Sequence, residues 1–208
     1  LPVVQLPTSL VAMVDASVGG KTAVDTPDGK NLVGAFHDPS AVVMDTQLLS
    51  TRPPDVLRSG LAEMLKHGII ADADYFAQVL AVAPKLRGDF GGQGLADALA
   101  PLVAGSVRIK AAVVAEDARE GGKRQILNFG HTIAHAIEKV RHYDMLHGDA
   151  VALGMIVEAR LAELAGVATA PLVTVVRDAV RAAGLPTELS AEVDRRAVLE
   201  ETRGDKKA

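Results

Sequence analysis

The sequence predicts a short α/β segment followed by a longer domain built only of helices. Two runs of β-branched apolar residues, at 2–6 and 40–45, are typical of short strands. From Pro53 onward the apolar residues recur with the 3.6-residue period of amphipathic helices. With 208 residues, 49% of them hydrophobic, the chain is long enough to bury a sizeable core.

The polar stretch between the two expected strands is rich in turn residues. It contains Gly19-Gly20, Pro27-Asp28-Gly29 and Asn31. Such residues favour tight turns and disfavour helices, so residues 15–34 are expected to form a loop or a hairpin.

Glycine-containing breaks divide the remaining chain into helical segments. The breaks fall at Gly88, Gly91-Gly92, Gly121-Gly122 and Gly184-Leu185-Pro186. The helices expected between them span 54–70, 73–84, 93–117, 127–140, 147–166, 170–184 and 190–203. The boundary between the α/β segment and the helical domain is therefore expected after residue 52.

Composition argues against several classes of partner and site. The net charge is −4 and there is no long basic tract, which argues against nucleic acid or an anionic membrane as partner. The absence of cysteine excludes disulfides and thiolate metal sites and is compatible with a reducing cytoplasm. We expect neither a signal peptide nor an apolar run near the ~18 residues that span a bilayer. Because Leu1 is followed at once by strand-like sequence, we expect the natural N-terminus to lie upstream.

Three histidines suggest a metal site. His131 and His135 are spaced i, i+4 and share one helix face, which is a common half of a zinc site. The same spacing also occurs where histidines only cap or pack. His147 begins the next expected helix, and a returning helix could bring it toward His131. A histidine at a helix end can equally serve local hydrogen bonding.

Glu63 interrupts an otherwise apolar helical stretch, with Lys66 and His67 three and four residues later. A carboxylate on an apolar face is expensive to bury unless it is paired or bound to a metal. The alternative is an ordinary Glu–Lys pair on a solvated face. One glutamate with two histidines, leaving one position open, is the ligand set of a catalytic zinc ion.

Several polar and cationic positions lie near these motifs in the sequence, namely Lys21, Lys30-Asn31, Lys110 and Arg124. Each one alone is more often a surface charge. Together they suit a substrate rich in phosphate and carboxylate oxygens. Spacing alone therefore suggests a zinc enzyme acting on an anionic metabolite.

Longer phrases of the chain resemble the 3-dehydroquinate synthase family of the sugar-phosphate cyclase superfamily. They are Pro7-Thr8-Ser9-Leu10, 14–24, Gly29-Lys30-Asn31-Leu32-Val33-Gly34-Ala35-Phe36, Ser59-Gly60-Leu61-Ala62-Glu63, Asn128-Phe129-Gly130-His131-Thr132, His135-Ala136-Ile137-Glu138 and Leu146-His147-Gly148. The phrases follow in the family's order, and the match continues to Asp205-Lys206-Lys207. Ser9 and Ala16 stand where the family more often has threonine and serine.

The resemblance implies roles for individual residues. The implied zinc ligands are Glu63, His131 and His147. The residues implied to take part in catalysis are His135, Lys66 and Asn128, with His135 facing the substrate instead of the metal. The implied substrate-binding residues are Asp15, Lys21, Asn31, Lys110, Arg124 and Lys206. The residues implied to contact NAD are Thr8, Ser9, Lys21, Lys30, Leu48 and Thr51.

The resemblance also implies an architecture and an activity. Residues 1–52 would be the C-terminal part of an NAD-binding α/β lobe, and 53–208 a helical domain for metal and substrate. The cofactors would be NAD and Zn²⁺, or another divalent ion such as Co²⁺. The expected reaction converts 3-deoxy-D-arabino-heptulosonate 7-phosphate to 3-dehydroquinate and phosphate, in the shikimate pathway. A cytoplasmic homodimer is expected.

Three other functions remain open. A related cyclase would make an inosose or a valiolone from a substrate without the carboxylate. A metal-dependent polyol dehydrogenase would release NADH, and a non-catalytic domain would keep only the fold. The joint presence of Lys110, Arg124, Asn128 and His135 favours 3-dehydroquinate synthase over the related cyclases.

Overall fold

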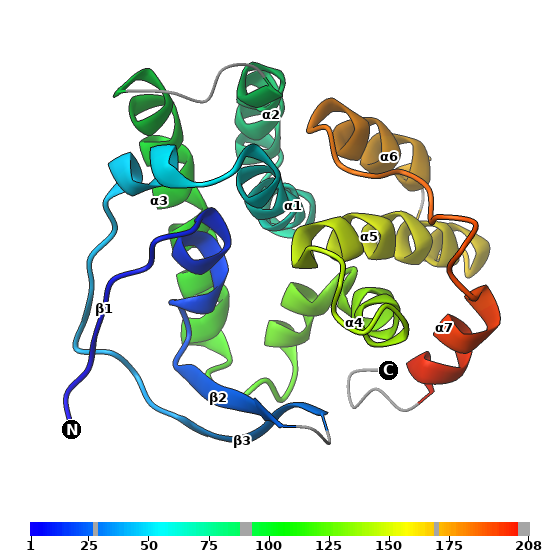
Figure 1. The fold of residues 1–208 in the computed structure, drawn as a ribbon, viewed down its shortest axis with the longest axis horizontal. Helices are drawn as coiled ribbons and strands as arrows, with labels where there is room; N and C mark the ends of the chain where they lie inside the picture. Colours follow the sequence, from blue (N-terminus) through cyan, green and yellow to red (C-terminus); the bar gives the residue numbers. More distant parts are fainter. Residues whose placement is uncertain (27–28, 88–92, 169–170, 204–208) are drawn as a thin grey trace.

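The computed structural model describes residues 1–26, 29–87, 93–168 and 171–203 (Figure 1). Helices make up most of this part of the chain. The short strands β1 and β4 lie at one side, and the hairpin β2–β3 runs beneath the helices in the view of Figure 1. The expected α/β segment followed by a helical domain is confirmed.

The two expected strands form a short parallel pair. β1 (Val4–Gln5) pairs with β4 (Ala41–Val42), so that Val4 lies opposite Ala41 and Gln5 opposite Val42. Both strands lie inside the expected ranges but are only two residues long. After β1 the chain enters the single-turn π-helix η1 (Ala12–Ala16), and after β4 it enters the 3₁₀ helix η2 (Thr46–Thr51).

The glycine-rich stretch forms a hairpin. β2 (Lys21–Thr26) pairs antiparallel with β3 (Gly29–Phe36), with a register shift between Val24 and Thr26. Gly20 begins the hairpin with a φ of +65°, and a Cβ there would lie 2.2 Å from an oxygen of Asp38. Only glycine fits this turn without strain.

The expected helices are confirmed, with shifts at their ends. They are α1 (Pro54–Ala71), α2 (Ala73–Val82), the 3₁₀ helix η3 (Ala83–Arg87), α3 (Gln93–Glu116), the 3₁₀ helix η4 (Lys123–Asn128), α4 (His131–Val140), α5 (His147–Leu164), α6 (Leu172–Ala182) and α7 (Arg195–Thr202). Helix α7 begins later than expected because the Asp194 side chain caps it, accepting from the backbone N–H groups of Arg196 and Ala197.

The largest difference concerns the segment 127–140, which was expected to be one helix. The structure splits it at Gly130, whose φ of +84° ends η4 and starts α4. The backbone N–H of Gly130 donates to Glu158 Oε2 at 2.7 Å. The split makes His131 the first residue of α4, at the helix end that faces α1.

The sequence was expected to contain no apolar run long enough to span a bilayer, and helix α3 contradicts this expectation. Its residues Gly94–Glu116 are long and apolar enough to cross a membrane, by length and composition alone. The core helices of water-soluble domains pass the same test. Here α3 packs against η1, η2 and α1, and its Lys110 is buried and paired with Asp15. The contacts are those of a core helix in this fold.

Helices α1, α4 and α5 form the centre of the molecule (Figure 1). Residues 59–68 of α1 are all buried, as is most of the first half of α5. Two glycines of α5 bring these helices to backbone contact. A Cβ on Gly148 would lie 1.9 Å from the carbonyl oxygen of Ser59, and one on Gly154 equally close to that of Gly130.

We expect Gly154→Ala to destabilise the protein by at least about 3 kcal/mol. The new methyl group would meet backbone, which cannot rotate away as a side chain could, so α4 and α5 must separate. Gly94→Ala is the matched control, because a Cβ there has no atom within 4 Å and alanine favours a helix. Urea unfolding of both variants measures the difference. Equal stability of Gly154→Ala and wild type would contradict the described packing.

Candidate metal centre

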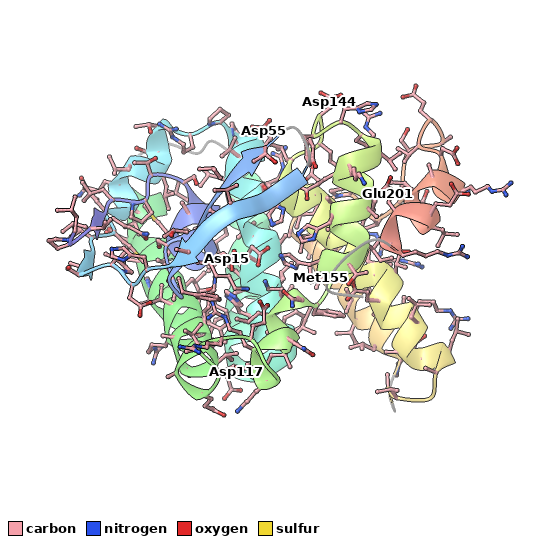
Figure 2. The ribbon with its side chains drawn as sticks, turned by 90° about the horizontal axis from the view of Figure 1, so that it is seen from below. Asp15, Asp55, Asp117, Asp144, Met155 and Glu201 are labelled. Carbon is pink, nitrogen blue, oxygen red and sulfur yellow. The ribbon has the colours of Figure 1, made fainter. Side chains whose placement is uncertain are left out.

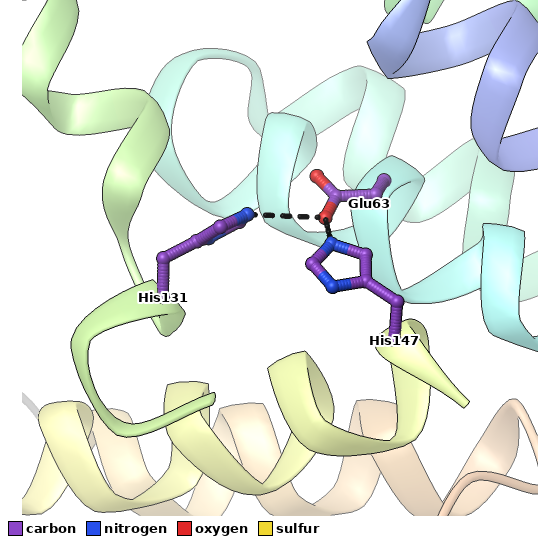
Figure 3. Close-up of side chains that lie close together, drawn as sticks. All are labelled: Glu63, His131 and His147. Atoms are coloured by element: carbon purple, nitrogen blue, oxygen red, sulfur yellow. Dashed lines mark ion pairs between the residues drawn. The ribbon is translucent and has the colours of Figure 1, made fainter. Parts of the chain in front are cut away.

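Side chains from three helices lie close together (Figure 3). Glu63 lies on α1, and His131 and His147 are the first residues of α4 and α5. Each offers one ligand atom, and these atoms all lie within 4.8 Å of one another. Glu63 Oε1 is 3.5 Å from His131 Nε2 and 3.3 Å from His147 Nε2.

The second ring nitrogen of each histidine has its own partner. His131 Nδ1 lies 3.3 Å from the carbonyl oxygen of Phe129, and His147 Nδ1 lies 3.2 Å from Glu138 Oε1. A carbonyl and a carboxylate can only accept, so we assign a proton to each Nδ1. When both rings are neutral, the lone pair of each Nε2 points toward Glu63 Oε1. Three acceptor atoms arranged in this way would suit a cation between them.

Glu63 is fully buried. Lys66 Nζ lies 2.5 Å from Oε2, yet neither carboxylate oxygen accepts a hydrogen bond of normal geometry from the described residues. Burial opposes ionisation, but the charge of Lys66 and the contact with His147 hold the pKa of Glu63 well below its usual range. The carboxylate is therefore ionised and able to bind a metal ion.

The two histidines differ in protonation. Burial and the nearby charge of Lys66 lower the pKa of His131 to about 3, so this ring is neutral. Burial also opposes the charge of His147, but its contacts with Glu138 and Glu63 raise its pKa to about 9. A divalent cation would take the place of the extra proton on His147. The Glu63, His131 and His147 donors fit zinc, and three protein ligands are the number found in catalytic zinc sites.

His135 lies outside this group of three. Its ring centre is 5.5 Å from that of His131, edge-on, and its side chain is half-buried. The i, i+4 spacing of His131 and His135 therefore does not produce a shared ligand pair here. The expectation that His135 faces a substrate stays a prediction.

A second group of charges adjoins the metal centre. Lys110 Nζ, on α3, donates to Asp15 Oδ1 at 2.6 Å and to the Asp15 carbonyl oxygen at 2.5 Å. Figure 2 shows Asp15 near the middle of the molecule. Burial and the charge of Glu63 oppose its ionisation, but Lys110 and Lys66 lower the pKa of Asp15 to about 2. Burial lowers the pKa of Lys110.

Glu120 has no signal in the sequence, yet it joins two of the predicted site residues. Its carboxylate forms an ion pair with Lys21 and accepts from Asn128 Nδ2 at 3.0 Å. Its φ is +61°, an uncommon conformation for a side chain of this size. Strained backbone of this kind is frequent at functional sites. Through its contacts with Lys21 and Asn128, Glu120 connects hairpin β2–β3 to η4.

Arg124 is buried, and its described contacts are with backbone. Its guanidinium donates to the carbonyl oxygens of Ala118 at 2.7 Å and Gly19 at 2.8 Å. These bonds hold the turn that precedes the hairpin. Substrate binding by Arg124 stays a prediction.

The residues expected to contact NAD lie after the two parallel strands. Thr8 and Ser9 follow β1, and Leu48 and Thr51 belong to η2, which follows β4. The carboxyl ends of parallel strands share one edge, where nucleotides bind in α/β folds, so the positions fit a dinucleotide. The side chains of Lys30 and Asn31 and the whole of Lys206 lie outside the described part of the chain.

His67 is a buried histidine close to Glu63 and Asp15. Its ring is fully buried, with Nδ1 2.5 Å from Ser106 Oγ. Burial and the charge of Lys66 lower the pKa of His67 to about 4. Between pH 6.5 and 4 the unfolded chain gains a proton that the folded state resists, so the free energy of unfolding falls as the pH falls.

We expect His67→Gln to remove up to about 3 kcal/mol of this acid-induced loss of stability. The check is urea unfolding of wild type and variant at several pH values between 7 and 4, with chelator present. Parallel curves for the two proteins would contradict the assignment of a neutral, buried His67.

Comparison with known proteins places this geometry in a family. The family model described as 3-dehydroquinate synthase C-terminal matches residues 60–208, and the corresponding N-terminal model matches 1–59. The 3-dehydroquinate synthase of Xanthomonas campestris pv. campestris (strain 8004) is 47% identical over 98% of this chain and 55% of its own length. That of Thermosynechococcus vestitus is 44% identical over 100% of this chain and 56% of its own length. The chain thus spans about half the length of these curated relatives.

Solved structures agree on the fold. A 2-deoxy-scyllo-inosose synthase complexed with carbaglucose-6-phosphate, NAD⁺ and Co²⁺ superposes with a TM-score of 0.89, at 27% identity over 100% of this chain and 55% of its own. The 2-epi-5-epi-valiolone synthase of Streptomyces hygroscopicus subsp. jinggangensis, with NAD⁺ and Zn²⁺ bound, gives 0.82 at 28% identity over 98% and 56%. A probable glycerol dehydrogenase from Sinorhizobium meliloti, at 18% identity over 97% and 62% with a TM-score of 0.59, shares the fold alone.

The two family models together match the chain from end to end, and the converging carboxylate and imidazoles lie within the matched residues. The chain belongs to the 3-dehydroquinate synthase family.

Proposed function

We propose that the protein acts as a 3-dehydroquinate synthase, converting 3-deoxy-D-arabino-heptulosonate 7-phosphate to 3-dehydroquinate and phosphate. The observation that carries this proposal is the convergence of Glu63, His131 and His147 beside several buried cationic side chains. The curated relatives named 3-dehydroquinate synthase, at 44–47% identity, support the choice of substrate.

Glu63, His131 and His147 would hold zinc or another divalent ion such as Co²⁺. NAD would lie against the segment after β1 and η2, touching Thr8, Ser9, Lys21, Lys30, Leu48 and Thr51. When bound, the metal would polarise a substrate hydroxyl, and NAD would take a hydride and return it within one turnover. The neighbouring cyclase structures containing NAD⁺ with Zn²⁺ or Co²⁺ support both cofactors.

The chain's own residues would bind and orient the substrate. Lys66 and Lys110 place ammonium groups in buried surroundings, where their charge acts strongly on phosphate and carboxylate oxygens. Asp15 holds Lys110 in place through two hydrogen bonds. The other residues proposed to bind substrate are Lys21, Asn31, Arg124 and Lys206.

Proton transfer would fall to His135, whose ring lies beside that of the ligand His131. The half-buried imidazole of His135 can donate or accept a proton at a substrate oxygen. Asn128 would orient the substrate through its amide, and Glu120 holds that amide at 3.0 Å. Holding one substrate conformer in this way accounts for much of the rate in an intramolecular ring closure.

We further propose that residues 1–52 belong to an NAD-binding lobe and 53–208 to the metal- and substrate-binding domain. The protein would act in the cytoplasm as a homodimer, without nucleic acid or a membrane as partner. The net charge of −4 supports the absence of nucleic acid.

The test of the substrate compares two sugar phosphates. The full-length protein, with zinc and NAD, should release phosphate from the heptulosonate phosphate and not from sedoheptulose 7-phosphate, which lacks the carboxylate. Turnover of sedoheptulose 7-phosphate alone would assign the protein to the valiolone-type cyclases instead.

A further inference from the structure

We propose that Glu138 is a positioning residue, which orients the ring of His147 and thereby strengthens metal binding. This inference deepens the proposed function and rests on the proposed metal site. It is carried by the burial of Glu138, by its contact with His147, and by the different way in which His131 is held.

Glu138 lies in the last turns of α4, seven residues after His131 and so on nearly the same face of the helix. Its side chain is buried, although it ends in a carboxylate. Burying a carboxylate is costly unless a hydrogen-bond donor or a cation compensates. A buried carboxylate at this position therefore indicates a specific contact and not apolar packing.

Glu138 contacts the ring of His147. Glu138 Oε1 lies 3.2 Å from Nδ1, while Nε2 on the other side of the same ring lies 3.3 Å from Glu63 Oε1. The ring is thus held between carboxylates from two different helices, α4 and α1. A carboxylate that accepts from Nδ1 fixes the tautomer and aims Nε2 at the metal.

His131 is oriented differently. Its Nδ1 faces the carbonyl oxygen of Phe129, two residues before it in the chain, so local backbone sets this ring. His147 has a 30% exposed side chain at the first position of α5 and depends on a side chain from another helix. Changing Glu138 should therefore loosen one ligand and leave the other in place.

The experiment measures metal affinity and ligand geometry in Glu138→Ala and Glu138→Gln. Zn²⁺ affinity is obtained by competition with a chromogenic chelator, and geometry from the visible absorption of the Co²⁺-substituted protein. We expect Glu138→Ala to lower the affinity 10- to 100-fold and to change the Co²⁺ spectrum. Glu138→Gln keeps an acceptor but loses the charge, so it should fall between Glu138→Ala and wild type.

Glu163→Gln is the matched control. Glu163 is also a glutamate with a structural hydrogen bond, accepting from the backbone N–H of Val173 at 2.9 Å, but it lies at the far end of α5. Its substitution should leave Zn²⁺ affinity and the Co²⁺ spectrum unchanged. Circular dichroism of the chelated proteins verifies folding, and Glu138→Gln decides the test if Glu138→Ala does not fold.

Two unfavourable results have different meanings. Wild-type Zn²⁺ affinity and an unchanged Co²⁺ spectrum in both Glu138 variants would overturn the role of Glu138 and leave the metal site standing. A wild-type protein that binds neither ion would overturn the proposed metal site, and the inference with it.

Discussion

His131→Ala should abolish stoichiometric zinc binding and lower the rate of phosphate release about 1,000-fold or more. His131 supplies one of three converging donor atoms, and burial keeps its ring neutral and ready to bind a cation. Alanine leaves only Glu63 and His147. The measurement is zinc content by atomic absorption beside a phosphate-release assay on the full-length protein.

The control for this experiment is His142→Asn. His142 lies in the exposed loop between α4 and α5, and its φ of +51° suits asparagine better than alanine. We expect its zinc content and rate to match wild type. A His131→Ala protein that retained a full equivalent of zinc would contradict the ligand assignment.

Glu63→Gln should lose zinc binding and also destabilise the metal-free protein by about 3–5 kcal/mol. Lys66 is as buried as Glu63, and the two groups lie 2.5 Å apart. The substitution keeps the shape of the side chain but leaves the ammonium without its carboxylate. Urea unfolding in the presence of chelator measures this effect separately from metal binding.

An exposed ion pair provides the comparison for Glu63→Gln. Asp178 and Arg181 form a pair at 2.7 Å on the surface of α6, with both side chains more than half exposed. Such pairs contribute little, so Asp178→Asn should not change the urea midpoint measurably. Equal midpoints for Glu63→Gln and wild type would mean that the buried pair does not stabilise the fold.

Much of the fold could be predicted from the sequence because the helices depend on local pattern. The ends of α1 and α3 agree with the periodicity to within one residue. The break at Gly130 could not be predicted, because it depends on the left-handed φ of this residue and on its bond to Glu158. Neither feature leaves a periodic signal.

The metal centre, like the fold, could be predicted from the sequence only in part. Spacing pairs His131 with His135 on one helix face and leaves open whether His147 and Glu63 belong to the same site. The structure instead brings His131 to His147 and Glu63, which lie on other helices. The resemblance to the family implied these three residues as the ligands, because family motifs reflect contacts between residues far apart in the sequence and local spacing does not.

The roles of Glu120 and Glu138 could not be predicted, for a related reason. Each acts on a predicted site residue from another element, Glu120 on Lys21 and Asn128, and Glu138 on His147. A lone glutamate in a loop or at the end of a helix looks like any surface charge in the sequence. Only the packed structure identifies its partner.

The most direct test of the proposed function follows phosphate and nicotinamide absorbance together. The full-length protein is given zinc, the heptulosonate phosphate and NAD in an amount far below the substrate. We predict that phosphate is released in proportion to substrate with no net NADH, and that chelation of zinc stops the release. Steady accumulation of NADH would contradict this account and indicate a dehydrogenase.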